Sequence, residues 1–455
     1  MKKPAPIGWM IALVVGLTLI AGQAPAPAQD STQSLSNVEA LGKLLFFDKN
    51  LSVNGTQSCA VCHGPEAGWT GPDAAVNLTT VVYQGAIPNR FGNRKPPASA
   101  YAGESPILYY NDEDGGWFGG MFWDGRATGN ILGDPLAEQA QGPYLNPLEQ
   151  ALPNARVLCQ KVQTAEYSSL FETVWGPGSL DCARDAMGVY EKIGRSVAAF
   201  ERSAEVNPFS SKFDRFWDKA KAAGKDVTKI KCGTGGGGMG PAMGCGGGGS
   251  DPNRWSAFRN LGLTDAELQG LAVFNDPSRA NCASCHTLEA GPQGYPLFTD
   301  FGYDNLGVPK NPDNPFYTMP TTWNPDGADW IDTGLGGYLK SAGYAADVYE
   351  PETGKMKVPT LRNVDLRPSP DFVKAYGHNG YFKSLEEIVF FYHWRAAMDG
   401  GGCSGGGGMG NCDQMAAMFP PPEVDENRTL LDMFPRPQVE NIVAFLKTLS
   451  DGSAP

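Results

Sequence analysis

The chain has 455 residues and a formal net charge of −13, from 36 Lys and Arg against 49 Asp and Glu. This acidic balance disfavours nucleic acid and anionic lipid as partners and suits neutral or basic ones. A chain of this length exceeds what one hydrophobic core usually serves, so we expect two domains.

The N-terminus has the layout of a secretory signal peptide. Lys2 and Lys3 precede an apolar run from about Ile7 to Ala21, and a small-residue site, Ala26-Pro27-Ala28, follows. We predict a cleaved signal peptide over residues 1–28, a periplasmic location and no membrane insertion after cleavage. An uncleaved anchor is the alternative, although the apolar run is short for a membrane span.

Two short motifs carry most of the chemistry: Cys59-Ala-Val-Cys62-His63 and Cys282-Ala-Ser-Cys285-His286. Each reads C-x-x-C-H, which is typical of c-type haem attachment: two thiols bond to the haem vinyl groups and the imidazole ligates the iron. On a helical turn these three positions share one face. We therefore predict two covalently bound haems, with His63 and His286 as iron ligands. The alternative is a pair of zinc or disulfide turns, each followed by an accidental His.

Helical patterns dominate the chain, and strand-like alternation is scarce. Amphipathic spacing predicts helices over residues 37–47 and 187–203, capping boxes begin helices at Thr264 and Ser384, and Pro437 opens a final helix. With 58 Gly and 36 Pro, we expect long, irregular connections.

Six cysteines remain after haem attachment, an even number that indicates three disulfides in an exported chain. Six cysteines allow fifteen connectivities. We pair Cys159 with Cys182, Cys232 with Cys245, and Cys403 with Cys412.

Two Gly-rich tracts, Cys232 to Ser250 and Cys403 to Cys412, share the hexapeptide GGGGMG. We interpret them as surface insertions that disulfides hold at their ends. A soft-metal site built from Met239, Met243, Met409 and thiolates is the alternative.

Eight segments of the sequence together resemble the bacterial dihaem cytochrome c peroxidases, including the MauG-like enzymes. They are ALGKLLFFDKNLS, MFWDGRATG, EQAQGPYLNPLEQ, SVAAFERS, LQGLAVF, CASCH, KVPTLRNVDLRP and AYGHNGYFKSLEEIVFFY. The resemblance implies an all-α fold of two c-type cytochrome domains. We place the peroxidatic domain at residues 35–217, a Gly-rich linker or insertion at 218–262, and the second haem domain at 263–450, with an insertion at 400–412.

The resemblance also assigns roles around the first haem. It implies that Glu149 is the general acid-base, that Gln139 orients peroxide, that Pro143 walls the pocket, and that Trp123 carries oxidising equivalents between the haems. A carboxyl group beside an apolar haem face should have a raised pKa, which suits a proton shuttle. Without the resemblance, Glu149 reads as a solvated surface acid and Trp123 as a core residue.

A histidine that closes the first haem in ordinary peroxidases of the family is missing here, because no His lies between His63 and His378. We expect a five-coordinate first haem, with Tyr83 as the alternative sixth ligand. At the second haem, the family register selects Tyr392 as the further iron ligand, where ordinary peroxidases have Met. His393 is the competing ligand, and we expect His378 to make either a propionate contact or a structural hydrogen bond.

The family usually binds a calcium ion between its domains, through an Asn in an R-N-x-P segment. Here Asn93 lies one or two places early, and Lys95 takes the expected position. Carbonyls near Arg367 and Pro368 would be further ligands, but the insertion SPDFVK disturbs that region. Calcium stays an open prediction, with a Lys ammonium as its substitute.

The leading hypothesis is an oxidoreductase that reduces hydrogen peroxide at the first haem. Its electrons come through the second haem, either from a small electron-transfer protein or from residues of a protein substrate. A dihaem electron carrier without catalysis is the alternative from another class, and a metal-handling protein built on the Gly-Met-Cys tracts is a third.

Overall fold

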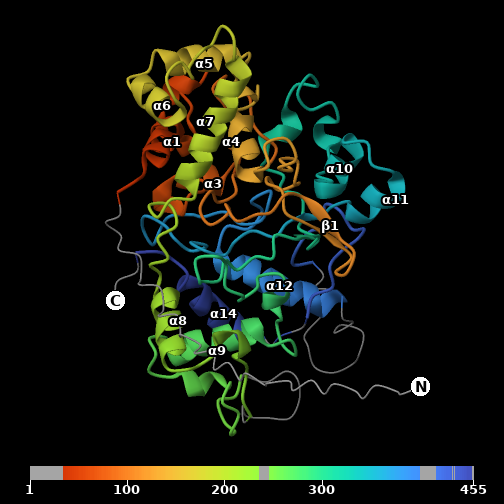
Figure 1. The fold of residues 1–455 in the computed structure, drawn as a ribbon. Helices are drawn as coiled ribbons and strands as arrows, with labels where there is room; N and C mark the ends of the chain where they lie inside the picture. Colours follow the sequence, from red (N-terminus) through yellow and green to blue (C-terminus); the bar gives the residue numbers. More distant parts are fainter. Residues whose placement is uncertain (1–33, 235–244, 400–416, 433, 435, 453–455) are drawn as a thin grey trace, which may run out of the picture.

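The computed structural model describes residues 34–234, 245–399, 417–432, 434 and 436–452. Helices and irregular connections dominate these residues, and two short antiparallel strand pairs complete them (Figure 1). The predicted signal peptide, the Cys403–Cys412 pair, and Met239, Met243 and Met409 lie outside the described residues. No helix within the described part of the chain combines the length and apolar character that a bilayer span requires.

Five helices of the N-terminal half pack around one hydrophobic core: α1 (Asn37–Phe47), α4 (Pro135–Leu145), α5 (Ala155–Gln163), α6 (Ser168–Trp175) and α7 (Ala186–Glu201). Helix α1 crosses α7 closely at Gly42, where an added Cβ would lie 1.9 Å from the carbonyl oxygen of Ser196. The predicted Cys159–Cys182 disulfide forms in this half. The helix predicted at residues 37–47 is confirmed.

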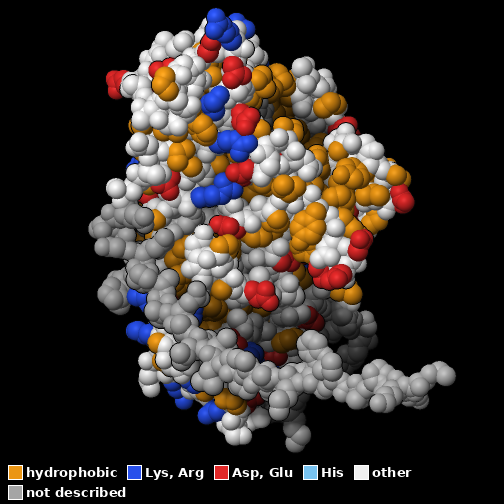
Figure 2. Space-filling model, in the orientation of Figure 1, with side chains coloured by type: hydrophobic (Ala, Val, Ile, Leu, Met, Phe, Trp, Pro, Cys, Tyr) orange, Lys and Arg blue, Asp and Glu red, His pale blue; other side chains and the backbone are white. Residues whose placement is uncertain are grey.

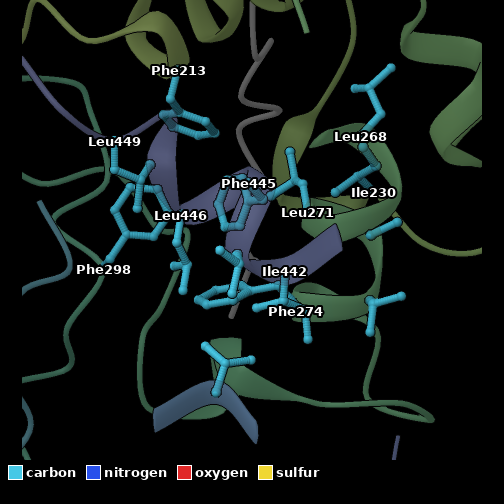
Figure 3. Close-up of a cluster of buried hydrophobic side chains, with 14 of the residues drawn as sticks. Phe213, Ile230, Leu268, Leu271, Phe274, Phe298, Ile442, Phe445, Leu446 and Leu449 are labelled. Atoms are coloured by element: carbon cyan, nitrogen blue, oxygen red, sulfur yellow. The ribbon is translucent and has the colours of Figure 1, made fainter. Parts of the chain in front are cut away.

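Four helices of the C-terminal half surround a second core: α8 (Lys212–Ala222), α9 (Asp265–Asn275), α12 (Leu385–Asp399) and α14 (Gln438–Lys447). Phe274, Ile442 and Phe445 lie at its centre (Figure 3). Helices α9 and α14 cross at Gly270, where an added Cβ would lie 1.9 Å from the carbonyl oxygen of Asn441. The two halves therefore share one kind of close helix crossing.

Local signals in the sequence locate the ends of several of these helices correctly. The capping box of Thr264 and Glu267 forms at the start of α9, and Pro437 is the N-cap of α14. At α12 the backbone N–H of Glu387 donates to the Ser384 hydroxyl, at 3.0 Å. The predicted Cys232–Cys245 disulfide also forms.

The predicted linker, residues 218–262, contributes buried side chains to the second core. Helix α8 continues across the boundary predicted after residue 217, and its Phe213 and Phe216 are fully buried in that core. Trp255 and Phe258, from the far end of the predicted linker, pack there too. This segment is therefore part of the C-terminal packing unit.

Short elements connect and flank the two halves. They include α2 (Cys59–Cys62), α3 (Ala74–Leu78), α10 (Gly334–Ser341) and α11 (Ala346–Tyr349). Strand β1 (Tyr109–Asn111) pairs with β2 (Gly116–Phe118), and β3 (Tyr303–Asp304) pairs with β4 (Met356–Lys357). The all-α expectation misses these two pairs, because the strands have only two or three residues each.

Apolar side chains gather on one face of the molecule, over the region of β1, α10 and α11 (Figure 2). Tyr109, Tyr110 and Tyr344 are exposed in this region. On the same face, basic and acidic side chains alternate along the N-terminal half, so no large patch of one sign forms there (Figure 2).

Candidate active site

The first C-x-x-C-H motif forms one short helical turn, α2, and His63 follows at its C-cap. The Nδ1 atom of His63 lies 3.3 Å from the carbonyl oxygen of Trp69. Burial lowers the pKa of His63 to about 4, so its imidazole is neutral. With Nδ1 held by a carbonyl, Nε2 is left to bind a metal, which is the usual arrangement of a ligating histidine.

The second motif is built in the same way on a 3-10 turn, Cys282–Ser284. The Nδ1 atom of His286 lies 2.9 Å from the carbonyl oxygen of Phe298, and burial lowers the pKa of this imidazole as well. All four motif cysteines are free thiols, so the disulfide-turn alternative is wrong. No group of three or more metal-ligating side chains forms in the described residues, which removes support for zinc turns there.

A cavity of about 60 Å³ lies beside the first motif. Its lining brings together residues that the sequence singled out: Cys59, Cys62, His63, Gln139, Pro143 and Glu149. Gln139 and Pro143 come from α4, and Glu149 comes from the turn that follows this helix. His63 is the one histidine in this lining.

Neighbouring residues hold the Glu149 side chain in one orientation. Its Oε1 atom accepts a hydrogen bond from the side-chain amide of Asn146, at 2.7 Å. Burial raises the pKa of Glu149, and the charge of Arg126 opposes this in part. The backbone carbonyl of Glu149 accepts from Ala86 N–H, at 2.7 Å, which fixes the turn. Glu149 is half-buried and hydrogen-bonded, which argues against a freely solvated surface acid.

Glu201 is a second carboxyl group on this cavity, one that no sequence motif singled out. It is the last residue of α7, is 4% exposed, and its Oε2 atom has no hydrogen-bond partner. Burial raises its pKa to about 8. One feature of the sequence could have indicated this position. Glu201 lies one helical turn after Val197 on α7, and Val197 lines the same cavity.

Tyr83 also lines the first cavity, but its hydroxyl is engaged elsewhere. It accepts a hydrogen bond from the backbone N–H of Asp73, at 2.9 Å, and burial raises its pKa. Burial raises the pKa of Tyr392 as well, so the pKa does not distinguish the two tyrosines as candidate ligands.

A larger cavity, of about 260 Å³, lies beside the second motif. Its lining includes Cys282, Cys285 and His286 together with Tyr392, Trp123 and His378. The hydroxyl of Tyr392 has no hydrogen-bond partner among the described residues. His393 is not in the lining, and its Nδ1 atom lies 2.6 Å from the carbonyl oxygen of Phe434. Of these two candidates, only Tyr392 therefore reaches the cavity.

Trp123 lies where the two halves of the chain meet. Its indole N–H donates to the carbonyl oxygen of Lys95, at 2.8 Å, and its ring centroid is 6.4 Å from that of His378. His378 is 8% exposed, its Nε2 atom lacks a hydrogen-bond partner, and Asp332 lies 3.9 Å away. The structure thus brings Trp123 and His378 to the second cavity, and Trp123 is absent from the lining of the first.

Comparison with known proteins identifies the family of this chain. The family model described as "Di-haem cytochrome c peroxidase" matches residues 36–222. The methylamine utilization protein MauG of Paracoccus denitrificans is 30% identical over 434 residues, which cover 93% of this chain and 90% of that protein. The cytochrome c551 peroxidase of Nitrosomonas europaea is 26% identical, with 80% and 75% of the two chains covered.

Among solved structures, the diheme peroxidase BthA from Burkholderia thailandensis superposes with a TM-score of 0.64 and 28% identity, over 93% of this chain and 89% of that one. The fold is thus that of the diheme peroxidases. The chain belongs to the family of MauG and the di-haem cytochrome c peroxidases.

Proposed function

We propose that this protein is a periplasmic, MauG-like dihaem c-type peroxidase that reduces hydrogen peroxide. The observation that carries the proposal is the lining of the first cavity, where Gln139, Pro143 and Glu149 lie beside Cys59, Cys62 and His63. The chain has four histidines, and His63 is the one in this lining. One face of the first site therefore has no imidazole to close it.

The two motifs have the chemistry to hold haem. The free thiols of each motif would form the thioether bonds, and the neutral imidazoles of His63 and His286 would ligate iron through Nε2. The phenol of Tyr392 would be the further ligand at the second site. Bound haem would supply the electron transfer that reduces peroxide.

The residues of the first cavity would handle the protons. Reduction of one hydrogen peroxide to two waters consumes two electrons and two protons. Glu149, whose pKa is raised, would take the proton from one peroxide oxygen and return it to the other. The Gln139 amide would orient the peroxide, and Pro143 would keep water from that wall of the cavity.

The reducing equivalents would enter through the second site, with Trp123 as the relay between the two cavities. Their source would be a small electron-transfer protein or oxidisable residues of a protein substrate. A phenolate ligand favours ferric and higher states over ferrous iron. Tyr392 therefore favours the protein substrate, because a site that stores oxidising equivalents accepts electrons less readily from a cytochrome.

The proposal is tested by adding stoichiometric peroxide to the ferric holoprotein and following its optical spectrum. We expect the absorbance of both haems to change together and to stay changed for longer than mixing takes. A spectrum that peroxide leaves unaltered would contradict the proposal and favour the non-catalytic electron carrier.

A further inference from the structure

A buried lysine joins the two halves of the chain at a site that the peroxidase chemistry does not use. The ammonium group of Lys374 donates to the carbonyl oxygens of Ala67, Asn363 and Leu366, at 2.9, 2.7 and 3.0 Å. Lys374 is 4% exposed. Its partner Ala67 lies 307 positions away in the sequence, so this one group connects distant segments.

The geometry is that of a charged ammonium. Three acceptors match the three hydrogens of a protonated lysine, whereas a neutral amine has two. No carboxylate of the described residues forms an ion pair with Lys374; its hydrogen-bond partners are three carbonyl groups. Burial and the nearby charge of Lys95 lower the pKa of Lys374, while the charge of Asp365 raises it. The three carbonyl groups favour a higher pKa of Lys374, because each accepts a stronger hydrogen bond from the charged ammonium than from the neutral amine.

Lys95 is the second buried ammonium of this junction. It donates to the hydroxyl of Thr70, at 2.8 Å, and to the carbonyl oxygen of Pro96, at 3.0 Å. Burial lowers its pKa to about 8. Its own backbone carbonyl holds the indole of Trp123, so the junction is directly connected to the proposed relay.

A calcium ion does not fit this arrangement. Calcium takes six to eight oxygen ligands at about 2.3–2.6 Å, usually with carboxylates among them. Here five oxygen atoms of the junction already accept from the two ammonium groups. Asn93, the ligand expected from the sequence, accepts at its backbone carbonyl from Asn314, and Asp365 pairs with Arg367.

We propose that Lys374, supported by Lys95, is a built-in cation that joins the two halves of the chain in the place where the family resemblance predicts calcium. Lys374 ends the insertion SPDFVK, so the same insertion that disturbs the expected ligands supplies the replacement charge. The position of Trp123, whose indole N–H donates to the Lys95 carbonyl oxygen, then needs no metal ion.

The first test measures calcium in the purified holoprotein and its response to a chelator. We expect far less than one calcium per chain, and the same melting temperature and the same optical and EPR spectra after dialysis against EGTA. One calcium per chain, with a melting temperature that falls on chelation and recovers on adding calcium, would overturn the proposal.

The second test replaces the charge while keeping the length of the side chain. Lys374→Met leaves three carbonyls without their donor, and we expect the melting temperature of the holoprotein to fall by about 5 °C or more. The control is Lys383→Met, because Lys383 also bridges the halves, with two carbonyl acceptors, and is only partly buried. The assignment would be contradicted if Lys374→Met had the melting temperature of the wild type, or if the control lowered the melting temperature more than Lys374→Met does.

Discussion

The two halves of the molecule share a helix crossing and a haem-attachment motif, but their cavities differ. In each half a glycine lets two helices approach closely, Gly42 with α7 and Gly270 with α14. The first cavity is lined by the half-buried Glu149 and the buried Glu201, beside His63; the lining of the second includes the phenol of Tyr392 as well as carboxyl groups such as Asp332. In the proposed function, the shared motif would hold a haem in each half and the residues that differ would set its role. Glu149 would handle protons at the first site, and Tyr392 would favour storage of oxidising equivalents at the second.

The largest effect is expected from a substitution in the first cavity, on the rate of the reaction with peroxide. Glu149→Gln keeps the shape of the side chain but removes the carboxyl group that would take up and return the proton. We expect the reaction with peroxide to slow by about 100-fold or more, measured as the rate of the optical change after rapid mixing. The matched control is Glu166→Gln, an exposed acid of the same half. Equal rates for both variants would remove Glu149 from the mechanism.

The next effect concerns the second cavity. Tyr392→Met replaces a phenol that favours ferric iron with a thioether that favours ferrous iron, so the reduction potential of the second haem should rise by about 100 mV or more. Spectroelectrochemical titration measures it. His393→Gln is the control, because His393 lies outside the cavity lining and should leave the potential unchanged. A shift in the control and none in Tyr392→Met would mean that the ligand is the adjacent histidine.

Glu201, in the first cavity, should make the free energy of unfolding depend on pH. Its pKa is raised from 4.5 to about 8 in the folded protein, so between these values the folded state holds a proton that the unfolded chain has released. The free energy of unfolding should therefore fall as pH rises through this window, by up to about 1.4 kcal/mol per pH unit. Glu201→Gln should flatten this dependence in denaturant titrations of the holoprotein. Parallel pH profiles for variant and wild type would contradict the raised pKa.

The smallest effect tests what the two halves share. Gly42→Ala and Gly270→Ala each place a Cβ 1.9 Å from a carbonyl oxygen of the crossing helix, and we expect each to destabilise the protein by about 2 kcal/mol. Gly92→Ala is the control, since nothing lies within 4 Å of its added Cβ. Thermal unfolding compares the three. A cost at only one of the two crossings would show that the halves are not built alike.

Features with a local cause could be predicted from the sequence. The cap of α9, the Pro437 start of α14 and the two C-x-x-C-H turns depend on residues within a few positions of one another. The pairs Cys159–Cys182 and Cys232–Cys245 also link neighbouring segments. The grouping of Gln139, Pro143 and Glu149 followed from the spacing that the family resemblance supplied.

Features built from distant segments could not be predicted in this way. Lys374 meets Ala67 across 307 positions, and no pattern near either residue indicates the contact. Glu201 looks like an ordinary charged helix end until the fold buries it against the first cavity. The packing of Trp255 and Phe258, from the predicted linker at residues 218–262, into the second core likewise depends on residues far away in the sequence.

The central claim is that the first haem has a face that no protein side chain closes, while Tyr392 closes the second. The EPR spectrum of the resting ferric holoprotein tests it most directly. We expect one high-spin and one low-spin signal of equal intensity, with the high-spin signal lost on adding a small anionic iron ligand. Two low-spin signals that no added ligand alters would contradict it.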